Sequence, residues 1–310
     1  MTEAVKKSFA SAVCGYWGLK IIRIYLRLLG LLLLFLTSKS QGIIIRHDVA
    51  PERYLASESV YPSVFFLKSI GDRRICAATL VDARWAITAA HCIEQVNLNE
   101  EVLNGNSYEV NIAGEKNYVD KVIFHPDFNK PAGLDVDLAL LRISYPRNIL
   151  NSFAVATEEV VPEEVVSFLG WGYSGIGTTG RNYTDGELRL ATNRITSDSV
   201  KRLRIRFDDP RVGASEPLEG MPSLGDSGGP VLINGAKGAS LVGIIVGQIK
   251  GANFTEERQG DYGSVAVFER IAPYLKWLKE VIETHNGLNR QFEVNLPQRN
   301  RALLEFVTQT

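Results

Sequence analysis

Beyond residue 42, short runs of apolar and β-branched residues alternate with segments rich in Gly, Pro, Asn and Asp. Runs of this length, bounded by turn-forming residues, are typical of β-strands. The pattern predicts strands before residue 150 at 63–68, 75–81, 85–88, 108–113, 119–124 and 138–143. It predicts further strands at 165–170, 187–192, 203–207, 230–233, 241–246 and 264–268. No helical pattern alternates with these runs, so an all-β barrel or sandwich is expected and a parallel α/β sheet is not.

The one long helical pattern lies near the C-terminus. Apolar residues recur at three- and four-residue spacing from Ile271 to Ile282, which predicts an amphipathic helix packed on the β-structure. Asn286-Gly287 predicts the end of this helix. Residues 288–310 form a polar tail with a weakly helical pattern at 301–306, and the sequence leaves open whether it is disordered or packs on the surface.

The first 40 residues have the pattern of a secretory signal peptide. Five Lys and Arg residues precede position 28, residues 28–36 are almost continuous leucine, and Ser38-Lys39-Ser40 offers a cleavage site between small residues. This apolar run is far shorter than the roughly 20 residues that span a bilayer. We therefore expect a secreted or periplasmic protein with no stable membrane association after cleavage. The alternative is an uncleaved membrane anchor over residues 17–36.

The composition and charge of the chain limit the kinds of partner and cofactor that we expect. The chain has 310 residues, 45% hydrophobic and 22% charged, which is enough for a large core in one large or two small domains. Its net charge of −1 gives no reason to expect a nucleic acid partner. The four histidines are scattered and no cysteine-rich spacing occurs, so neither a metal nor another cofactor is expected.

Two cysteines remain once the predicted leader, which contains Cys14, is removed. Cys76 and Cys92 make an even count in a chain expected to be exported, which favours one disulfide over two separate buried thiols. The triplets Asn182-Tyr183-Thr184 and Asn253-Phe254-Thr255 match glycosylation sequons, which matter only if the source is eukaryotic.

Three polar residues, each in a distinctive segment, could together perform acyl transfer. Ser227 lies in the glycine-rich turn Gly225-Asp226-Ser227-Gly228-Gly229-Pro230, where its hydroxyl can face a substrate. A serine hydroxyl needs a base, and His91 in Thr88-Ala89-Ala90-His91-Cys92 is the candidate. Asp137, in Asp137-Leu138-Ala139-Leu140-Leu141, can orient the imidazole. The backbone N–H groups of Gly225 and Ser227 can stabilise the charge that develops on a substrate carbonyl oxygen.

Each of these assignments has a competitor. Asp135 could replace Asp137, but Asp137 directly precedes an apolar run and can point inward, whereas Asp135 has the setting of a solvated loop charge. A buried core histidine is the non-catalytic interpretation of His91. Among the other histidines, His285 sits at the predicted helix end and His125 precedes a proline in a loop.

These segments resemble those of the chymotrypsin-like, or trypsin-fold, serine peptidases. In that family a TAAHC segment carries the base, a D-[IL]-A-L-L segment the orienting acid, and GDSGGP the nucleophile. The separations of 46 residues from His91 to Asp137 and 90 from Asp137 to Ser227 are close to those of the family. Leu169-Gly170-Trp171-Gly172 and the closing strand and helix at 268–278 also match, so the resemblance covers about residues 60–285.

The resemblance implies two antiparallel six-stranded β-barrels followed by a C-terminal helix, with the active site between the barrels. The first barrel would cover about residues 43–155, and the second, with the helix, about 156–287. A signal peptide (1–40) would precede this peptidase domain (41–287), and the tail (288–310) would follow it. The resemblance also implies that Cys76 pairs with Cys92. The expected protein is a monomeric secreted serine endopeptidase that cleaves protein or peptide substrates through an acyl-enzyme.

The chain departs from the family at its N-terminus. In the family, the ammonium of a new Ile-Val-Gly-Gly terminus pairs with the aspartate before the nucleophile, here Asp226. This chain instead has Gly42-Ile43-Ile44-Ile45 after the predicted leader. One hypothesis is that trimming past Ser40 produces a terminus at Ile43 that inserts. The other is that Arg46 or His47 reaches Asp226 within the intact chain.

The chain also departs from the family at the primary substrate pocket. Met221, six residues before the nucleophile, aligns with the base of that pocket, and Gly247 and Ala266 align with its walls. A trypsin-like enzyme has an aspartate at the position of Met221, where it binds Lys or Arg. The alignment therefore predicts a preference for apolar substrate side chains.

Two other functions compete with a peptidase. A catalytically silent relative could use the same barrels as a binding module, although silent relatives usually lose at least one of the three polar residues. An esterase is suggested by Gly225-x-Ser227-x-Gly229, but an α/β-hydrolase needs the order Ser, Asp, His and a parallel sheet. Both the order and the strand pattern oppose that assignment.

Overall fold

The computed structural model describes residues 42–131, 134–144, 153–157, 160–235, 238–250, 255 and 258–294, the last of these without side chains from residue 287 on. The predicted leader and Asn253 lie outside the described residues. Asn182, of the other sequon, is exposed. Within the described part of the chain, no helix has the length and apolar character needed to cross a membrane.

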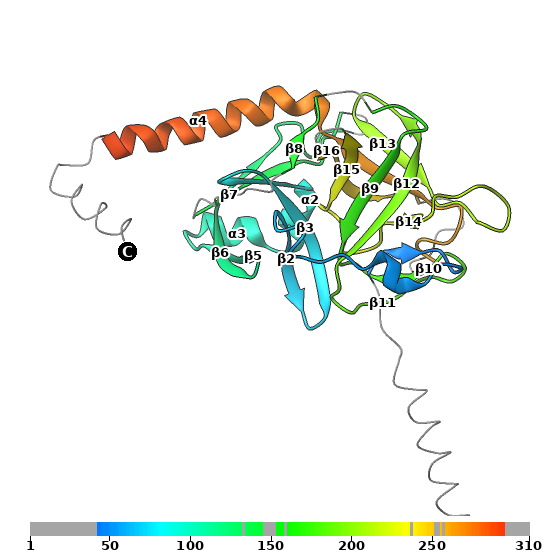
Figure 1. Ribbon diagram of the computed structural model, residues 1–310. Coiled ribbons are helices and arrows are strands. Elements are labelled where there is room, and N and C mark those ends of the chain that lie inside the picture. The colour runs from blue at the N-terminus through cyan, green and yellow to red at the C-terminus, as the bar shows by residue number, and fades with distance from the viewer. Residues whose placement is uncertain are drawn as a thin grey trace, which may run out of the picture. The chain divides into compact units, whose positions relative to one another are not determined.

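Six strands build the first barrel (Figure 1): β2 (Val64–Ile70), β3 (Arg73–Asp82), β4 (Trp85–Thr88), β5 (Tyr108–Ile112), β6 (Glu115–Phe124) and β7 (Ala139–Ile143). Their order in the sheet is β2-β3-β4-β7-β6-β5, with all neighbours antiparallel. The hydroxyl of Tyr108 donates to the carbonyl oxygen of Leu67 at 3.1 Å and links the two edge strands, β5 and β2. Apolar side chains fill the centre, with Trp85, Ile87 and Leu140 fully buried.

Six strands also build the second barrel: β9 (Val165–Gly170), β12 (Arg189–Asp198), β13 (Arg202–Arg206), β15 (Pro230–Gly235), β16 (Gly238–Gln248) and β17 (Val265–Arg270). Their order is β15-β9-β12-β13-β17-β16, and pairing of β15 with β16 closes the barrel. A short strand, β8 (Ala154–Val155), adds to β16 in parallel. Each of the predicted strands overlaps one of the strands in these two barrels, and the predicted fold is confirmed.

A smaller sheet holds the start of the described chain. Its strands are β1 (Ile44–Ile45), β10 (Ser174–Ile176), β11 (Gly180–Tyr183) and β14 (Gly220–Met221), in the order β11-β10-β1-β14. Ile43, Ile44 and Ile45 are fully buried there. Segments of two to four residues are too short to show a period, so the sequence pattern did not predict them. A 3₁₀ turn, η1 (Pro51–Tyr54), follows β1.

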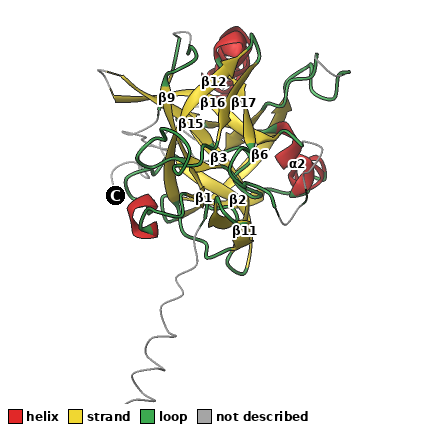
Figure 2. Cartoon of the chain, turned by 90° about the vertical axis from the view of Figure 1, so that its right-hand side faces the viewer, coloured by secondary structure: helices red, strands yellow, loops and turns green. Residues whose placement is uncertain are grey.

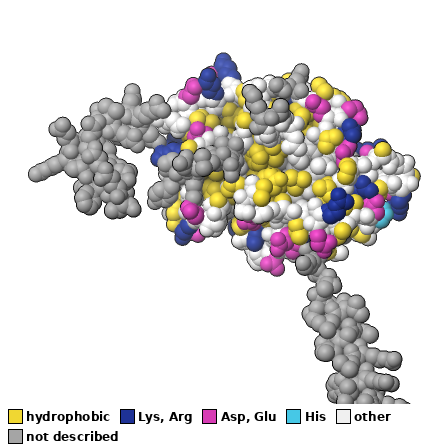
Figure 3. Space-filling model, in the orientation of Figure 1, with side chains coloured by type: hydrophobic (Ala, Val, Ile, Leu, Met, Phe, Trp, Pro, Cys, Tyr) yellow, Lys and Arg dark blue, Asp and Glu magenta, His cyan; other side chains and the backbone are white. Residues whose placement is uncertain are grey.

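Helices lie at the periphery of the strands (Figure 2). Two short ones, α2 (Ala90–Gln95) and α3 (Leu98–Leu103), connect β4 to β5. The C-terminal helix begins with the 3₁₀ turn η2 (Ala272–Tyr274) and continues as α4 (Leu275–Val294). Charged side chains of both signs are interspersed on the face shown in Figure 3, with apolar side chains gathered near its centre.

The predicted end of this helix at Asn286-Gly287 is wrong, because α4 continues to Val294 and takes in the first residues of the predicted tail. A single glycine inside a helix costs only about 1 kcal/mol relative to alanine. Packing on the first barrel opposes that cost: Asn286 Oδ1 accepts a hydrogen bond from Trp85 Nε1 at 3.3 Å, and the His285 ring packs edge-on against the same indole. Figure 1 shows α4 leaving the second barrel and running past the first.

Candidate active site

The fold places His91 where a buried strand turns into a helix. Strand β4 ends at Thr88, and α2 begins at Ala90. Ala89 and Ala90 are fully buried, and such small side chains let this turn lie close to the barrel core. The hydroxyl of Thr88 donates to the carbonyl oxygen of Ala77 at 2.6 Å and ties the turn to β3. His91 itself stays partly exposed, as a group that acts on a substrate must be.

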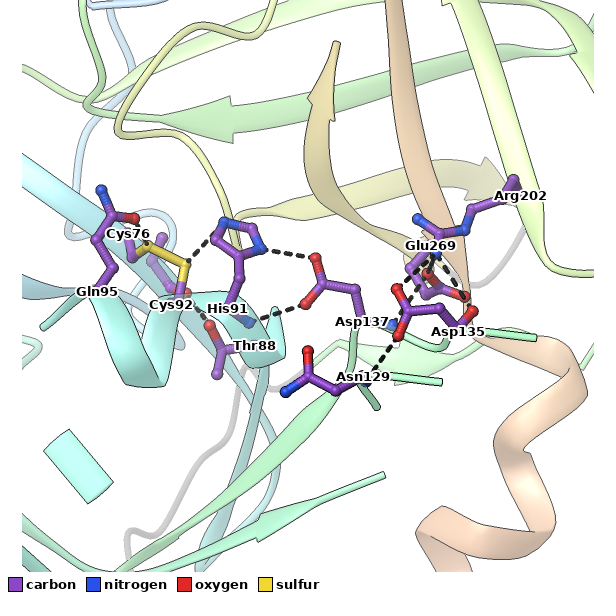
Figure 4. Close-up of polar contacts among 11 residues, drawn as sticks. Cys76, Thr88, His91, Cys92, Gln95, Asn129, Asp135, Asp137, Arg202 and Glu269 are labelled. Carbon is purple, nitrogen blue, oxygen red and sulfur yellow. Dashed lines mark hydrogen bonds and ion pairs between the residues drawn. A yellow bond between two sulfur atoms is a disulfide. The ribbon is translucent and has the colours of Figure 1, made fainter. Parts of the chain in front are cut away.

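A disulfide braces this turn. Cys76 in β3 and Cys92 in α2 are bonded, with their Cα atoms 5.8 Å apart, which confirms the predicted pairing (Figure 4). His91 Nε2 lies 3.8 Å from the sulfur of Cys92. The two sulfurs and the imidazole form a tight His/Cys group, but sulfurs bonded to each other offer no thiolate to a metal ion.

Removing this disulfide should destabilise the protein measurably. Replacing Cys76 and Cys92 together by alanine is expected to lower the free energy of unfolding by about 3 kcal/mol, because the bond closes a short loop in the unfolded chain. The sequence separation is 16 residues. Urea denaturation under oxidising conditions measures the change. A reductant should reproduce the loss in the wild type and leave the double variant unaffected; a fully reduced wild type of unchanged stability would contradict the prediction.

Asp137 contacts His91 through both of its carboxylate oxygens (Figure 4). Its Oδ2 lies 2.6 Å from His91 Nδ1, and its Oδ1 accepts the His91 backbone N–H at 2.9 Å. Burial favours the protonated acid, but the hydrogen bonds and charge of His91 outweigh it and hold the pKa of Asp137 below its ordinary value. A carboxylate that is ionised and bonded to Nδ1 fixes the ring and directs Nε2 outward.

The competing residues are engaged elsewhere. Asp135 Oδ1 accepts the backbone N–H of Asn129 at 2.9 Å. His47 contacts the hydroxyl of Tyr262 at 2.7 Å. His285 contacts the carbonyl oxygen of Val281.

His125 accepts the backbone N–H of Asp127 at 3.1 Å and packs edge-on against Tyr274 and Trp277, where burial lowers its pKa. Of the candidate pairs, only His91 and Asp137 are joined in the described structure.

The turn that carries Ser227 lies against the histidine segment. The carbonyl oxygen of Ser227 accepts the backbone N–H of Ala77 in β3 at 2.8 Å, across the junction of the two barrels. Gly228 has a φ of 80°, and a Cβ on it would lie 2.1 Å from the Ala77 oxygen and 2.3 Å from Thr88 Oγ1. Only glycine fits there. The Ser227 side chain is partly exposed, and within the described residues no hydrogen bond joins its Oγ to His91.

Asp226 is fully buried behind this turn. Its Oδ1 accepts the Gly172 N–H at 2.6 Å, and its Oδ2 accepts the Ser223 N–H at 2.8 Å. Burial raises the pKa of Asp226 to about 7 despite these bonds. A side chain at Gly170 or Gly172 would collide with its carboxylate, which accounts for both glycines of the Gly-Trp-Gly motif.

The structure does not support the hypothesis that Arg46 or His47 reaches Asp226. Arg46 forms an ion pair with Asp48 at 2.7 Å and donates to the carbonyl oxygen of Glu216 at 2.8 Å. His47 is bonded to Tyr262 through both its backbone and its ring. Among the described residues, the carboxylate of Asp226 is instead bonded to the backbone N–H groups of Gly172 and Ser223.

The residues predicted to form the substrate pocket lie close together, and the side chain of Gln248 lies among them. Met221 and Ala266 are fully buried, and Ala266 pairs with Gln248 at the end of β16. Gln248 Nε2 reaches the carbonyl oxygen of Pro222, directly after Met221, at 2.9 Å. Gly247 borders open space. No sequence motif indicates Gln248, because its partner lies 26 residues away along the chain.

Comparison with known proteins agrees with this architecture, which is that of the chymotrypsin-like double-barrel class. Residues 55–278 match the family model described as Trypsin. Serine protease 1 of Canis lupus familiaris is 30% identical over 220 residues, covering 67% of this chain and 80% of that protein. Kallikrein 1-related peptidase b22 of Mus musculus is 26% identical over 275 residues, covering 81% of this chain and 97% of that protein.

A solved structure shares the fold. It is of neuropsin, a serine protease expressed in the limbic system of mouse brain, with a TM-score of 0.55 and 21% identity. The match covers 74% of this chain and 98% of the neuropsin chain. The chain belongs to the trypsin family of serine peptidases.

Proposed function

We propose that this protein is a serine endopeptidase with Ser227 as nucleophile, His91 as general base and Asp137 as the orienting carboxylate. The observation that carries the proposal is the 2.6 Å contact between His91 Nδ1 and Asp137 Oδ2. The Ser227 turn is anchored to Ala77, one residue from the disulfide that holds the histidine turn. Membership of the trypsin family supports the same assignment.

In the proposed reaction, Ser227 Oγ attacks the carbonyl carbon of the scissile peptide bond while His91 Nε2 takes the hydroxyl proton. The oxyanion receives hydrogen bonds from the backbone N–H groups of Gly225 and Ser227. His91 then gives its proton to the leaving amine, which breaks the C–N bond and leaves an acyl group on Ser227. Water, deprotonated by His91, hydrolyses that ester. No cofactor takes part in this scheme.

We further propose that the protein is exported, either released after leader cleavage near Ser40 or anchored by an uncleaved segment, and acts as a monomer on protein or peptide substrates.

Labelling with a fluorophosphonate tests the catalytic proposal against the alternative of a silent binding module. An adduct on Ser227 that forms far more slowly in His91→Ala supports the peptidase, because the serine hydroxyl then lacks the base that takes its proton. Folded, processed protein without an adduct supports the binding module.

We propose that the enzyme is activated by a new N-terminus at Ile43. Gly42 packs so closely on the carbonyl oxygen of Gly172 that a Cβ there would lie 3.2 Å from it, and Asp226 contacts the same residue. An ammonium on Ile43 would therefore be generated near the buried Asp226 carboxylate, which needs a cation if it is to stay ionised.

The pH dependence of stability tests this activation. In a chain that keeps Gly42, the pKa of Asp226 is raised from an ordinary 3.8 to about 7, so its ionisation opposes folding. Between those pH values the folded state binds more protons, so stability falls as the pH rises through the window and stays low above it. Asp226→Asn should then raise Tm at pH 8, by roughly 2–4 °C for each kcal/mol, and change it little near pH 4.

In a chain that starts at Ile43, the same Asp226→Asn substitution removes the partner of the ammonium. It should lower Tm at pH 8 and abolish most activity. Thermal unfolding of both chain forms at pH 4 and pH 8 is the measurement. Equal responses of the two forms would contradict insertion of Ile43, and so would an active protein whose N-terminus is an intact Gln41.

We propose that the enzyme prefers apolar side chains before the scissile bond. We further propose that it prefers small ones, because the side chain of Gln248 reaches the carbonyl oxygen of Pro222, beside Met221, and would fill part of the predicted pocket. Gln248→Gly should raise the kcat/KM ratio of Leu or Phe to Ala substrates by at least about tenfold, since room for added methylenes is worth that much. Peptide substrates that differ only at this residue measure the ratio. Gln259→Gly, which removes a glutamine in contact with Arg181 instead, should leave it unchanged. An unchanged ratio in Gln248→Gly, or a wild type that prefers Arg, would contradict the proposal.

A further inference from the structure

Glu269 lies on the side of Asp137 that faces away from His91, and it comes from the second barrel (Figure 4). It is the fifth residue of β17, and its side chain is fully buried. Its Oε2 accepts the backbone N–H of Asp137 at 3.3 Å. The carboxylate of Glu269 therefore holds the backbone of Asp137, whose own carboxylate contacts His91. No sequence motif indicates this contact.

Arg202 supplies the positive charge that this buried acid needs. Its guanidinium Nη2, from β13, lies 2.9 Å from Glu269 Oε2, while the hydroxyl of Tyr274 donates to Oε1 at 3.2 Å. Burial raises the pKa of Glu269 to about 7, and the charge of Arg202 opposes that rise. The Arg202 side chain is 25% exposed, so it keeps contact with water.

Side chains of the second barrel form hydrogen bonds with the backbone of the segment that leads to Asp137. Arg202 also donates to the carbonyl oxygen of Asp135 at 3.4 Å, and Lys201 Nζ donates to that of Leu134 at 2.8 Å. Together with Glu269, these side chains hold backbone atoms at three positions between residues 134 and 137. These three hydrogen bonds are made to backbone atoms and do not compete for the carboxylate oxygens of Asp137. Arg202 Nη2 also lies 4.0 Å from Asp135 Oδ2.

A purely structural role accounts poorly for this arrangement. Burying an ion pair is often no more stabilising than packing apolar residues of similar volume, because both charges lose their hydration. The pair instead adds a directional acceptor at one N–H group, that of Asp137. The 2.6 Å contact between Asp137 and His91 depends on where that backbone lies.

We propose that Glu269, with Arg202 as its counter-ion, is a positioning residue that fixes the Asp137 backbone from the second barrel and so aims the Asp137 carboxylate at His91. Its kinetic consequence rests on the proposed peptidase function, but its structural consequence does not, because the His91–Asp137 hydrogen bond exists without substrate. The test therefore needs one readout of each kind.

The first readout is the NMR resonance of the proton between His91 Nδ1 and Asp137 Oδ2, which a short hydrogen bond shifts to low field and protects from exchange with water. Glu269→Ala should weaken this resonance and raise its exchange rate at least about tenfold. Glu269→Gln keeps an acceptor for the Asp137 N–H and should retain the wild-type signal. Arg202→Gln, at a partly exposed position, should shift the signal in the same direction as Glu269→Ala and serves where the alanine variant fails to fold.

The second readout is turnover of a peptide substrate. Glu269→Ala should lower kcat by about 100-fold, the order of effect that a misplaced catalytic group has, with KM within about twofold because Glu269 touches no substrate. Glu269→Gln should recover most of kcat. Asp198→Asn is the matched control: it breaks the 2.9 Å ion pair of the adjacent Arg270, whose guanidinium also donates to the carbonyl oxygen of Val160, and both readouts should stay at wild type.

Wild-type values of the resonance and of kcat in Glu269→Ala would overturn the proposal. Equal losses in Asp198→Asn would also overturn it, because general loosening of the second barrel would then account for the effect. A resonance that depends on Glu269 in a protein without turnover would support the positioning role and reject the peptidase function instead.

Discussion

Replacing Ser227 or His91 by alanine is expected to lower kcat by about 10⁶-fold while leaving the fold intact. Without Ser227 Oγ there is no group to carry the acyl intermediate, and without the imidazole no base removes the hydroxyl proton. In the proposed mechanism both residues act in one step, so the double variant should lose little more than either single variant. Peptide turnover and circular dichroism of the variants measure the two effects.

Two control variants separate catalysis from folding. Ser223→Ala removes, from the same turn, a buried hydroxyl that has no hydrogen-bond partner among the described residues, and His47→Ala removes an imidazole that contacts Tyr262. Neither group reaches the His91–Asp137 pair, so both variants should keep turnover within a few-fold of the wild type. Undiminished turnover in Ser227→Ala would rule out the serine mechanism.

Asp137→Asn is expected to lower kcat by about 10⁴-fold with the structure little changed. An asparagine amide can donate to Nδ1, which favours the tautomer with its proton on Nε2. That tautomer cannot accept the serine proton. The neutral amide also loses the stabilisation that a carboxylate gives to the imidazolium. The wild-type carboxylate stays ionised in neutral solution because His91 holds the pKa of Asp137 below its ordinary value.

Asp135→Asn is the matched comparison, two residues away in the same segment. Its Oδ1 accepts the Asn129 N–H, a role that an amide oxygen can fill. Its Oδ2 makes only a partly exposed 4.0 Å contact with Arg202, and such exposed pairs contribute little, so the shorter Arg202–Glu269 pair stays in place and kcat should remain within about twofold of the wild type. Turnover at saturating substrate and pH 8 compares the two variants. Similar losses in both would show that the charge of the segment matters and that the contact of Asp137 with His91 does not.

The sequence was informative where local chemistry is distinctive. Short apolar and β-branched runs located the barrel strands, and 85–88 and 165–170 match β4 and β9 in full, because buried strands flanked by turn residues have few alternatives. The segment motifs led to His91 and Asp137, which the structure joins. The pairing of Cys76 with Cys92 followed from cysteine count and resemblance, and the structure contains it.

Contacts between distant segments were beyond sequence reasoning. Glu269 lies in the segment that resembles the closing strand of the family, and nothing local to it shows that β17 brings it to the N–H of Asp137. Gln248 reaches the carbonyl oxygen of Pro222, 26 residues away along the chain, and no local pattern shows that contact. The stop expected at Asn286-Gly287 failed for the same reason, since a tertiary contact with Trp85 supports the helix where its local sequence does not.

Trapping of the acyl-enzyme tests the central claim most directly. A slowly hydrolysed peptide ester is mixed with protein that starts at Ile43, the reaction is quenched with acid, and the digested chain is analysed by mass spectrometry. The account predicts one acyl group per molecule on Ser227, absent in Ser227→Ala and formed far more slowly in His91→Ala. Hydrolysis at full rate with no acyl group on Ser227, or with the group on another residue, would contradict it.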